Sequence, residues 1–293
     1  MKKLLRSVYL GIPGKLSVFR IIRFFANVPE MIWKHLYFEG TFNFTFKGKN
    51  VLLNNYNSSF ETSIFWTNTF MDEKVSLEVW NELSKHSNTI IDVGANAGVY
   101  SIVAALANDS ATIVAFEPIS RIYKRLLENI EANQLNVSTE ELALSNANGE
   151  SIIYDLPVDH HYHASLNKQE VVHHAGLTEQ VIRVCRFDDY AKEHGLSDID
   201  LVKIDVEGFE LEVLEGMLTT LKTELPSVLI ELKDAKRSIA VEQMLNGLGY
   251  TFYNVDEAKG ISNTTTLGAS SKWNYVLLSP KHRHLAKLLE TSN

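Results

Sequence analysis

The sequence predicts an α/β fold with a mostly parallel sheet, an antiparallel closing strand and an N-terminal helical extension. A β-branched run at Thr89–Asp92 ends in a carboxylate and leads through a glycine-containing turn into a helical segment, Val99–Ala107. Further apolar runs alternate with helical patterns after it, which is typical of parallel strands joined by crossover helices. No helical pattern separates the last two strands, Tyr250–Asn254 and Trp273–Leu278, so we expect them to pair antiparallel.

Each element follows from the spacing of its apolar residues. Helices are expected at 16–28, 74–84, 99–107, 121–132, 211–221 and 239–248. Strands are expected at 41–46, 51–53, 89–92, 111–116, 137–143, 151–154, 201–204, 228–231, 250–254 and 273–278, with a polar loop at 256–271. The chain then divides into a basic amphipathic helical extension (1–40), a strand hairpin with a helix (41–88) and the main α/β domain (89–293).

Composition limits the class of protein. The chain has 293 residues, of which 45% are hydrophobic and 22% charged, as in an ordinary soluble domain. Cys185 is the only cysteine, which excludes an internal disulfide and fits a reducing, cytoplasmic compartment. A net charge of −8 argues against general nucleic-acid binding and leaves small molecules and glycans among the possible substrates.

The N-terminal segment has the opposite charge. Residues 1–29 carry six basic side chains and no acid (+6), so the rest of the chain carries −14. In the expected helix, Arg20, Arg23 and Asn27 form a narrow polar stripe and large apolar residues cover the remainder. No run reaches the roughly 18 apolar residues of a spanning helix. Residues 1–29 can lie on the inner membrane surface as a peripheral contact, or they can pack on the protein or a partner subunit.

The turn after the first core strand predicts the kind of ligand. It reads D-x-G-x-N-x-G from Asp92 to Gly98, without the G-x-G-x-x-G spacing of a dinucleotide site. A carboxylate ahead of the first glycine repels phosphate and attracts a cationic sulfonium and amino-acid group. The glycines let the backbone approach such a ligand closely. The turn therefore favours a sulfonium nucleoside over a dinucleotide.

Four segments in order resemble the FkbM family of S-adenosylmethionine-dependent O-methyltransferases. They are IDVGANAGVYS (91–101), AFEP (115–118), ALSNANGE (143–150) and DLVKIDVEGFELEVLEG (200–216), and FWTNTF (65–70) is also similar. The resemblance covers roughly residues 61–232. It implies a class I methyltransferase (Rossmann-like) fold, S-adenosylmethionine as cofactor, and methylation of a hydroxyl of a sugar, glycolipid or related metabolite.

The resemblance also implies where the cofactor binds. Glu117 ends the second strand, 19 residues after Gly98, where a carboxylate can accept both ribose hydroxyls. The segment that starts at Ala143 matches the place where such enzymes hold adenine. The candidate cofactor-binding residues are Asp92, Gly94, Asn96, Gly98, Glu117, Pro118, Ala143, Leu144 and Asp205.

Three residues in DLVKIDVEGFE are the catalytic candidates: Lys203, Asp205 and Glu207. Lys203 and Asp205 share one face of their strand, and a buried lysine needs a partner. If this strand lies beside the first, Asp92, Asp205 and Glu231 meet at the carboxyl edge of the sheet. Such carboxylates can position a hydroxyl and remove its proton, or hold the cofactor's charged end. A divalent ion on Asp205, Glu207 and a histidine is an alternative that the family does not demand.

The segment between Tyr154 and Val181 is rich in histidine. It is either a polar surface insertion or a substrate-binding lid, and its histidines are His160, His161, His163, His173 and His174.

Two other functions are also considered for the whole chain. An NAD(P)-linked sugar oxidoreductase or epimerase would need glycines at positions 96 and 99, which are Asn96 and Val99. A membrane-associated binding protein could keep the fold without turnover.

Overall fold

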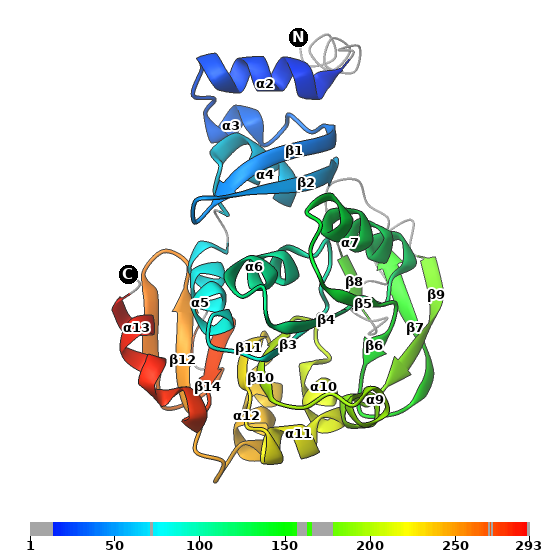
Figure 1. Ribbon diagram of the computed structural model, residues 1–293, viewed down its shortest axis with the longest axis vertical. Helices are drawn as coiled ribbons and strands as arrows, with labels where there is room; N and C mark the ends of the chain where they lie inside the picture. The colour runs from blue at the N-terminus through cyan, green and yellow to red at the C-terminus, as the bar shows by residue number, and fades with distance from the viewer. Residues whose placement is uncertain are drawn as a thin grey trace. The chain divides into compact units, whose positions relative to one another are not determined.

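The computed structural model describes residues 14–70, 73–156, 163–165, 178–268, 270 and 272–291 (Figure 1). The chain divides into two compact units. Unit 1 holds the described residues 14–70, and unit 2 holds those from residue 73 onward. The helix at 74–84 belongs to unit 2, whereas the sequence-based segments grouped it with the hairpin in 41–88.

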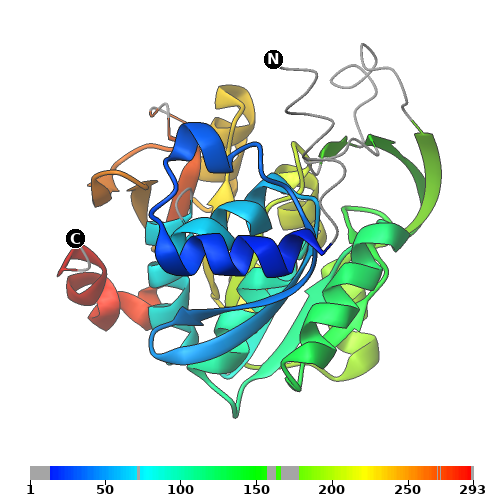
Figure 2. The same ribbon diagram turned by 90° about the horizontal axis from the view of Figure 1, so that it is seen from above.

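Unit 1 is a β-hairpin covered by helices. Its elements are α2 (Lys15–Phe25), α3 (Glu30–Trp33), β1 (Glu39–Phe46), β2 (Lys49–Tyr56) and α4 (Ser59–Thr67). The predicted hairpin is confirmed, with β1 and β2 antiparallel over their full lengths. Figure 2 shows α2, in dark blue, running along the hairpin. The helix α2 ends at Phe25, three residues earlier than expected.

The core of unit 1 is aromatic. Phe38 and Phe42 are fully buried and pack edge-to-face on Phe65. Phe65 comes from α4, a helix that the sequence analysis did not predict. Its start is fixed by Ser58, whose hydroxyl accepts from the backbone amides of Phe60 and Glu61. The S-x-x-E pattern that often marks a helix start was present in the sequence at 58–61.

Unit 2 is built on an eight-stranded sheet with the order β13-β12-β14-β11-β10-β3-β4-β5. The neighbours from β11 to β5 are parallel, while β14 pairs antiparallel with both β11 and β12. The predicted sheet and its antiparallel closing strand are therefore confirmed. The strands are β3 (Thr89–Val93), β4 (Thr112–Phe116), β5 (Ser138–Glu140), β10 (Ile199–Ile204), β11 (Ser227–Glu231), β12 (Thr251–Asp256), β13 (Gly260–Thr264) and β14 (Asn274–Leu278).

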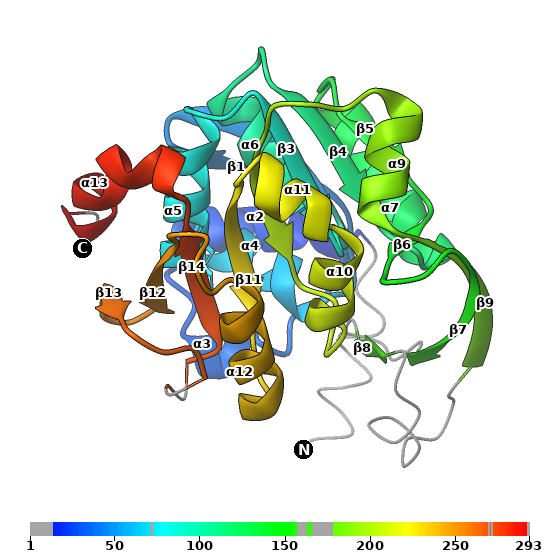
Figure 3. The same ribbon diagram turned by 90° about the horizontal axis from the view of Figure 1, so that it is seen from below.

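Helices cover both faces of this sheet (Figures 1 and 3). One face carries α5 (Lys74–Ser84), α6 (Val99–Ala107) and α7 (Ser120–Ala132). The other carries α9 (Phe187–His194), α10 (Glu210–Gly216), α11 (Leu218–Thr223) and α12 (Ala235–Met244). The chain ends in the 3₁₀ turn η1 (Pro280–Leu285) and α13 (Ala286–Thr291). Every residue of β3 and β10 is buried, as central parallel strands require.

Several sequence-based boundaries were wrong. The strand expected at 137–143 is two strands, because β6 (Ala143–Leu144) leaves the main sheet for a second one with the order β6-β9-β7-β8. Its other members are β7 (Gly149–Leu156), β8 (His163–Ser165) and β9 (Thr178–Cys185). The loop expected at 256–271 contains β13, and the helix expected at 211–221 is divided into α10 and α11 at Met217.

No helix in the described part of the chain has both the length and the hydropathy needed to cross a bilayer.

Candidate active site

The turn after β3 is pressed against the end of β10. Gly94 adopts φ +76°, and a Cβ on it would lie 2.0 Å from the carbonyl oxygen of Asp205. The amides of Gly94 and Ala95 both donate to the carbonyl oxygen of Phe116, the last residue of β4. The turn is thereby fixed between two neighbouring strands, and only glycine fits at position 94.

Glu117 follows β4 and faces this turn. It is 5% exposed, and its two carboxylate oxygens accept from the amides of Asn96 (3.1 Å) and Ile119 (2.9 Å). Burial raises the pKa of Glu117 to about 7, against the effect of these two amides. Each carboxylate oxygen keeps a second lone pair, so the group can still accept hydrogen bonds from a pair of hydroxyls.

Asp92 lies at the end of β3 with one oxygen satisfied. Its Oδ2 accepts from the hydroxyl of Ser101 at 2.6 Å, while Oδ1 is buried without a hydrogen-bond partner among the described residues. The same is true of Asn96 Oδ1. Burial raises the pKa of Asp92, and the Lys203 ammonium opposes this rise. Two buried acceptors without donors are costly, so this turn fits a ligand that brings donors of its own.

The predicted neighbourhood of β3 and β10 is confirmed, with Lys203 directly beside Asp92 in the parallel register. The buried Lys203 ammonium contacts Asp205 Oδ2 at 3.1 Å and lies 4.5 Å from the centre of the Tyr100 ring. Although burial acts in the opposite direction, the lysine holds the pKa of Asp205 below its ordinary value. Lys203 therefore pairs with Asp205 at the sheet edge, and its charge also acts on Asp92.

Three carboxylates meet at this edge: oxygens of Asp205, Glu207 and Glu231 lie within 4.8 Å of one another. Lys233 bridges two of them, with its ammonium 2.8 Å from oxygens of both Glu207 and Glu231. Burial raises the pKa of Glu231 to about 7, helped by the negative charge of Asp205 and opposed by Lys233. The pKa of Asp205 and the pKa of Glu231 thus shift in opposite directions, which favours the ionised form of Asp205 over that of Glu231.

Residues 92–252 match the family model described as the methyltransferase FkbM domain. The chain belongs to this family.

The chain covers only part of the length of two relatives. It is 26% identical over 227 residues to the AMB antimetabolite synthetase AmbE of Pseudomonas aeruginosa, covering 65% of this chain and 11% of AmbE. It is 28% identical over 142 residues to the hexuronic acid methyltransferase AglP of Haloferax volcanii, covering 48% of this chain and 55% of AglP. The chain therefore spans about half of AglP and a small part of AmbE.

A third relative is covered more fully. The chain is 25% identical over 189 residues to the 31-O-demethyl-FK506 methyltransferase FkbM of Streptomyces tacrolimicus, covering 56% of this chain and 73% of that protein.

The FkbM domain and the class I topology imply S-adenosylmethionine as the cofactor, and the turn fits it. This ligand brings an α-ammonium, a sulfonium and two ribose hydroxyls to a site that offers the buried carboxylates of Asp92 and Glu117 and the buried Oδ1 atom of Asn96. Such a match favours the methyltransferase over the NAD(P)-linked oxidoreductase that the sequence left as an alternative.

The other cofactor candidates lie on elements around this turn. Gly98 is the N-cap of α6, and Pro118 directly follows Glu117. Ala143 and Leu144 form β6 beside Val184 and Cys185 of β9, and Leu144 shares a buried cluster with Phe116. None of the described contacts joins β6 to Asp92 or Glu117, so an adenine contact there stays a prediction.

Two residues near this edge, Glu73 and Tyr100, were not predicted from the sequence. Glu73 hydrogen-bonds the Tyr100 side chain, and the charges of Lys203 and Asp205 act on it. Burial raises the pKa of Glu73 to about 7. Tyr100 lay inside the segment that resembles the family, but nothing in the sequence linked residue 73 to a strand that begins 126 residues later.

The predicted metal alternative needs a histidine beside Asp205 and Glu207. His160, His161, His173 and His174 lie outside the described residues, as does the side chain of His163. Between Glu207 and Glu231, a lysine ammonium already supplies positive charge. Asp205, Glu207 and Glu231 are close enough to share a cation, but a histidine ligand and a lid both depend on residues outside the described part of the chain, so these two alternatives stay predictions.

Proposed function

We propose that the protein transfers the methyl group of S-adenosylmethionine to a hydroxyl of a sugar, glycolipid or related metabolite in the cytoplasm. The observation that carries this proposal is the pair of unsatisfied buried acceptors, Asp92 Oδ1 and Asn96 Oδ1, beside Glu117 in an FkbM domain. When bound, S-adenosylmethionine supplies an electrophilic methyl group.

In this proposal the chain's own residues bind, orient and deprotonate. Glu117 accepts the ribose hydroxyls, and Asp92 with Asn96 accepts the remaining donors of the cofactor. Glu231 takes the proton of the acceptor hydroxyl, because a carboxylate with a pKa of about 7 is half ionised at neutral pH. Asp205 keeps that pKa high through its negative charge, and Lys203 positions Asp205.

The choice of a hydroxyl on a sugar has two supports. AglP is named as a hexuronic acid methyltransferase and the Streptomyces FkbM as a 31-O-demethyl-FK506 methyltransferase, and both are similar in sequence to this chain. The net charge of −8 disfavours a nucleic-acid substrate. We place the methyltransferase activity in segment 89–293, whose proposed cofactor residues all lie in unit 2.

The test is a labelling experiment. The full chain is incubated with methyl-labelled S-adenosylmethionine and separated lipid, polysaccharide and small-metabolite fractions, with the Glu231→Gln variant as the matched control. We expect label in a hydroxyl-bearing fraction with the natural chain and at least about a hundredfold less with the variant. Binding of the cofactor without label in any fraction would support the non-catalytic alternative.

A further inference from the structure

Helices α2 and α3 of unit 1 expose a cluster of large apolar side chains. Among the described residues, nine large hydrophobic side chains are exposed, and five of them fall within twelve positions of the chain. We call these five the apolar patch: Ile21 (61% exposed), Phe24 (82%), Phe25 (80%), Met31 (72%) and Ile32 (49%). Burying a phenylalanine is normally favourable, so such a concentration indicates a surface that another body covers.

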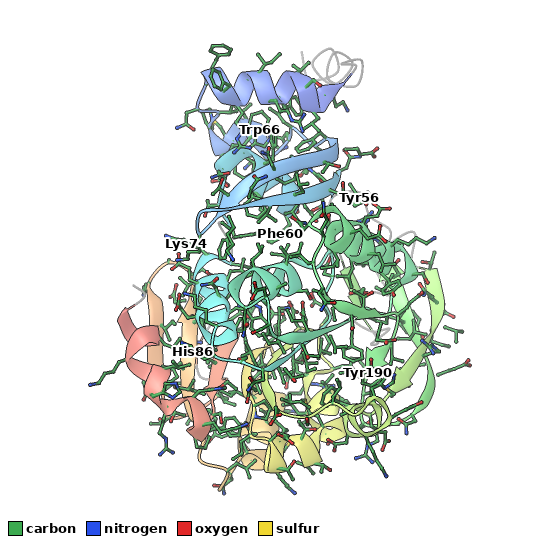
Figure 4. The ribbon with its side chains drawn as sticks, viewed as in Figure 1. Tyr56, Phe60, Trp66, Lys74, His86 and Tyr190 are labelled. Atoms are coloured by element: carbon green, nitrogen blue, oxygen red, sulfur yellow. The ribbon has the colours of Figure 1, made fainter. Side chains whose placement is uncertain are left out.

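The patch is not left over from an incomplete core, because α2 already packs through its other side. Phe19 is 1% exposed and its ring lies 5.3 Å from that of Trp66, which Figure 4 labels beneath α2. Arg20 donates to the carbonyl oxygen of Thr41 at 2.8 Å. Arg23 lies 5.0 Å from the centre of the Phe65 ring.

The arginines of the predicted polar stripe lie beside other parts of unit 1. Arg20 donates to Thr41 while staying exposed, and the half-buried Arg23 reaches Asn68 and Phe65. Ile21, Phe24 and Phe25 are exposed as well. The outward side of α2 is apolar with cations at its margin.

The charge around the apolar patch indicates which kind of surface binds it. Residues 14–38 contain four cations (Lys15, Arg20, Arg23 and Lys34) and one anion (Glu30), a formal charge of +3 in a chain of −8. Both arginines hydrogen-bond uncharged oxygens, so their positive charge is not cancelled there. A two-fold dimer would place this positive patch against itself, which like charges oppose.

We propose that α2 and α3 bind an anionic bilayer surface, with the apolar patch inserted among the lipids and the flanking cations at the headgroups. Aromatic and aliphatic side chains bordered by lysine and arginine are the combination that binds this interface. The proposal does not depend on the methyl transfer proposed above, because every residue that it uses lies in unit 1.

The test is co-sedimentation of the full chain with vesicles of phosphatidylcholine, with and without phosphatidylglycerol. The variant Phe24→Ser/Phe25→Ser removes the centre of the patch. The matched control Val181→Ser/Ile239→Ser removes exposed apolar side chains from unit 2 (62% and 53% exposed). Unchanged circular dichroism and unchanged unfolding transitions show that each variant is folded.

We expect the natural chain and the control to bind the anionic vesicles, and the double phenylalanine variant to bind at least about tenfold less. Binding should also weaken as salt is added, because the cations contribute. Equal binding by the two variants overturns the proposal, as does failure of the natural chain to bind anionic vesicles. A dimer that Phe24→Ser/Phe25→Ser abolishes, without any vesicle binding, would assign the patch to a second copy instead.

Discussion

The two buried carboxylates at the turn after β3, Asp92 and Glu117, have different roles. Glu117 stabilises the turn, because it accepts hydrogen bonds from the amide of Ile119, near the end of its own strand, and from the amide of Asn96 in the turn. Asp92 leaves an oxygen unsatisfied and is therefore the better partner for a cation. Both have a raised pKa because of burial, so a cationic ligand that favours the ionised form offsets part of that cost.

Glu117→Gln should weaken S-adenosylmethionine binding. The amide keeps the side-chain volume and one acceptor oxygen but loses the charge and an acceptor, which costs about 1–3 kcal/mol. Isothermal titration calorimetry measures the change, with Glu193→Gln, an exposed acid on α9, as control. An affinity equal to that of the natural chain would mean that the ribose is not held by Glu117.

Glu231 should set the pH dependence of the reaction. Its pKa is raised to about 7, so its basic form accumulates as pH increases through 7 and the rate should rise over that interval. In Glu231→Gln the rate should fall at least about a hundredfold and lose this rise. Glu73 and Glu117 also have pKa values of about 7, so an unaltered profile in Glu231→Gln would transfer the proton step to another group.

At the residue scale, sequence motifs located the turn but could not locate its long-range partners. Asp92, Gly94, Asn96 and Glu117 meet because a strand, a turn and the next strand end are consecutive in the fold. Glu73 reaches Tyr100 because α5 packs on α6, a contact that depends on tertiary structure and leaves no local pattern.

At the scale of elements, the turn after β3 can lie against the end of β10 because Gly94 has no side chain. Gly94→Ala should destabilise the protein through left-handed strain, about 1–2 kcal/mol, and through a clash with the Asp205 carbonyl. Gly195→Ala is the matched control, because Gly195 has φ +64° and nothing lies within 4 Å of its added Cβ. Urea unfolding should therefore show a larger loss for Gly94→Ala, together with weaker cofactor binding.

Equal losses for the two alanine variants would show that the turn moves away from β10 without cost. The requirement for glycine at position 94 would then come from its backbone conformation alone and not from the clash with Asp205.

The elements that the sequence predicted well are those whose pattern is complete by itself. Strands β3 and β10 are buried along their whole length and read as continuous apolar runs. Strand β13 buries only Gly260 and Ile261, and β9 buries only Ile182 and Val184. Their pairing with β12 and β7 determines them, and two buried positions in each were too few to predict a strand from the sequence.

At the scale of the whole molecule, deletion of residues 1–29 is a poor test of membrane binding, because it removes part of the core of unit 1. Phe19 is 1% exposed, whereas Phe24 on the same helix is 82% exposed. Phe19→Ala should cost unit 1 about 3–5 kcal/mol, and Phe24→Ala should change its stability by less than about 0.5 kcal/mol. Urea unfolding of the two variants makes this comparison, and equal effects would contradict the packing described for α2.

Two compact units also predict two unfolding transitions with different responses to the cofactor. All proposed cofactor residues lie in unit 2, so S-adenosylmethionine should stabilise unit 2 by about 2.7 kcal/mol at about 100 times its Kd. The transition of unit 1 should stay where it is, and Phe19→Ala should lower that transition alone. Differential scanning calorimetry with and without the cofactor separates the two. A single transition that responds to both changes would mean that the units fold as one cooperative body, and that the boundary near residue 71 is structural without being energetic.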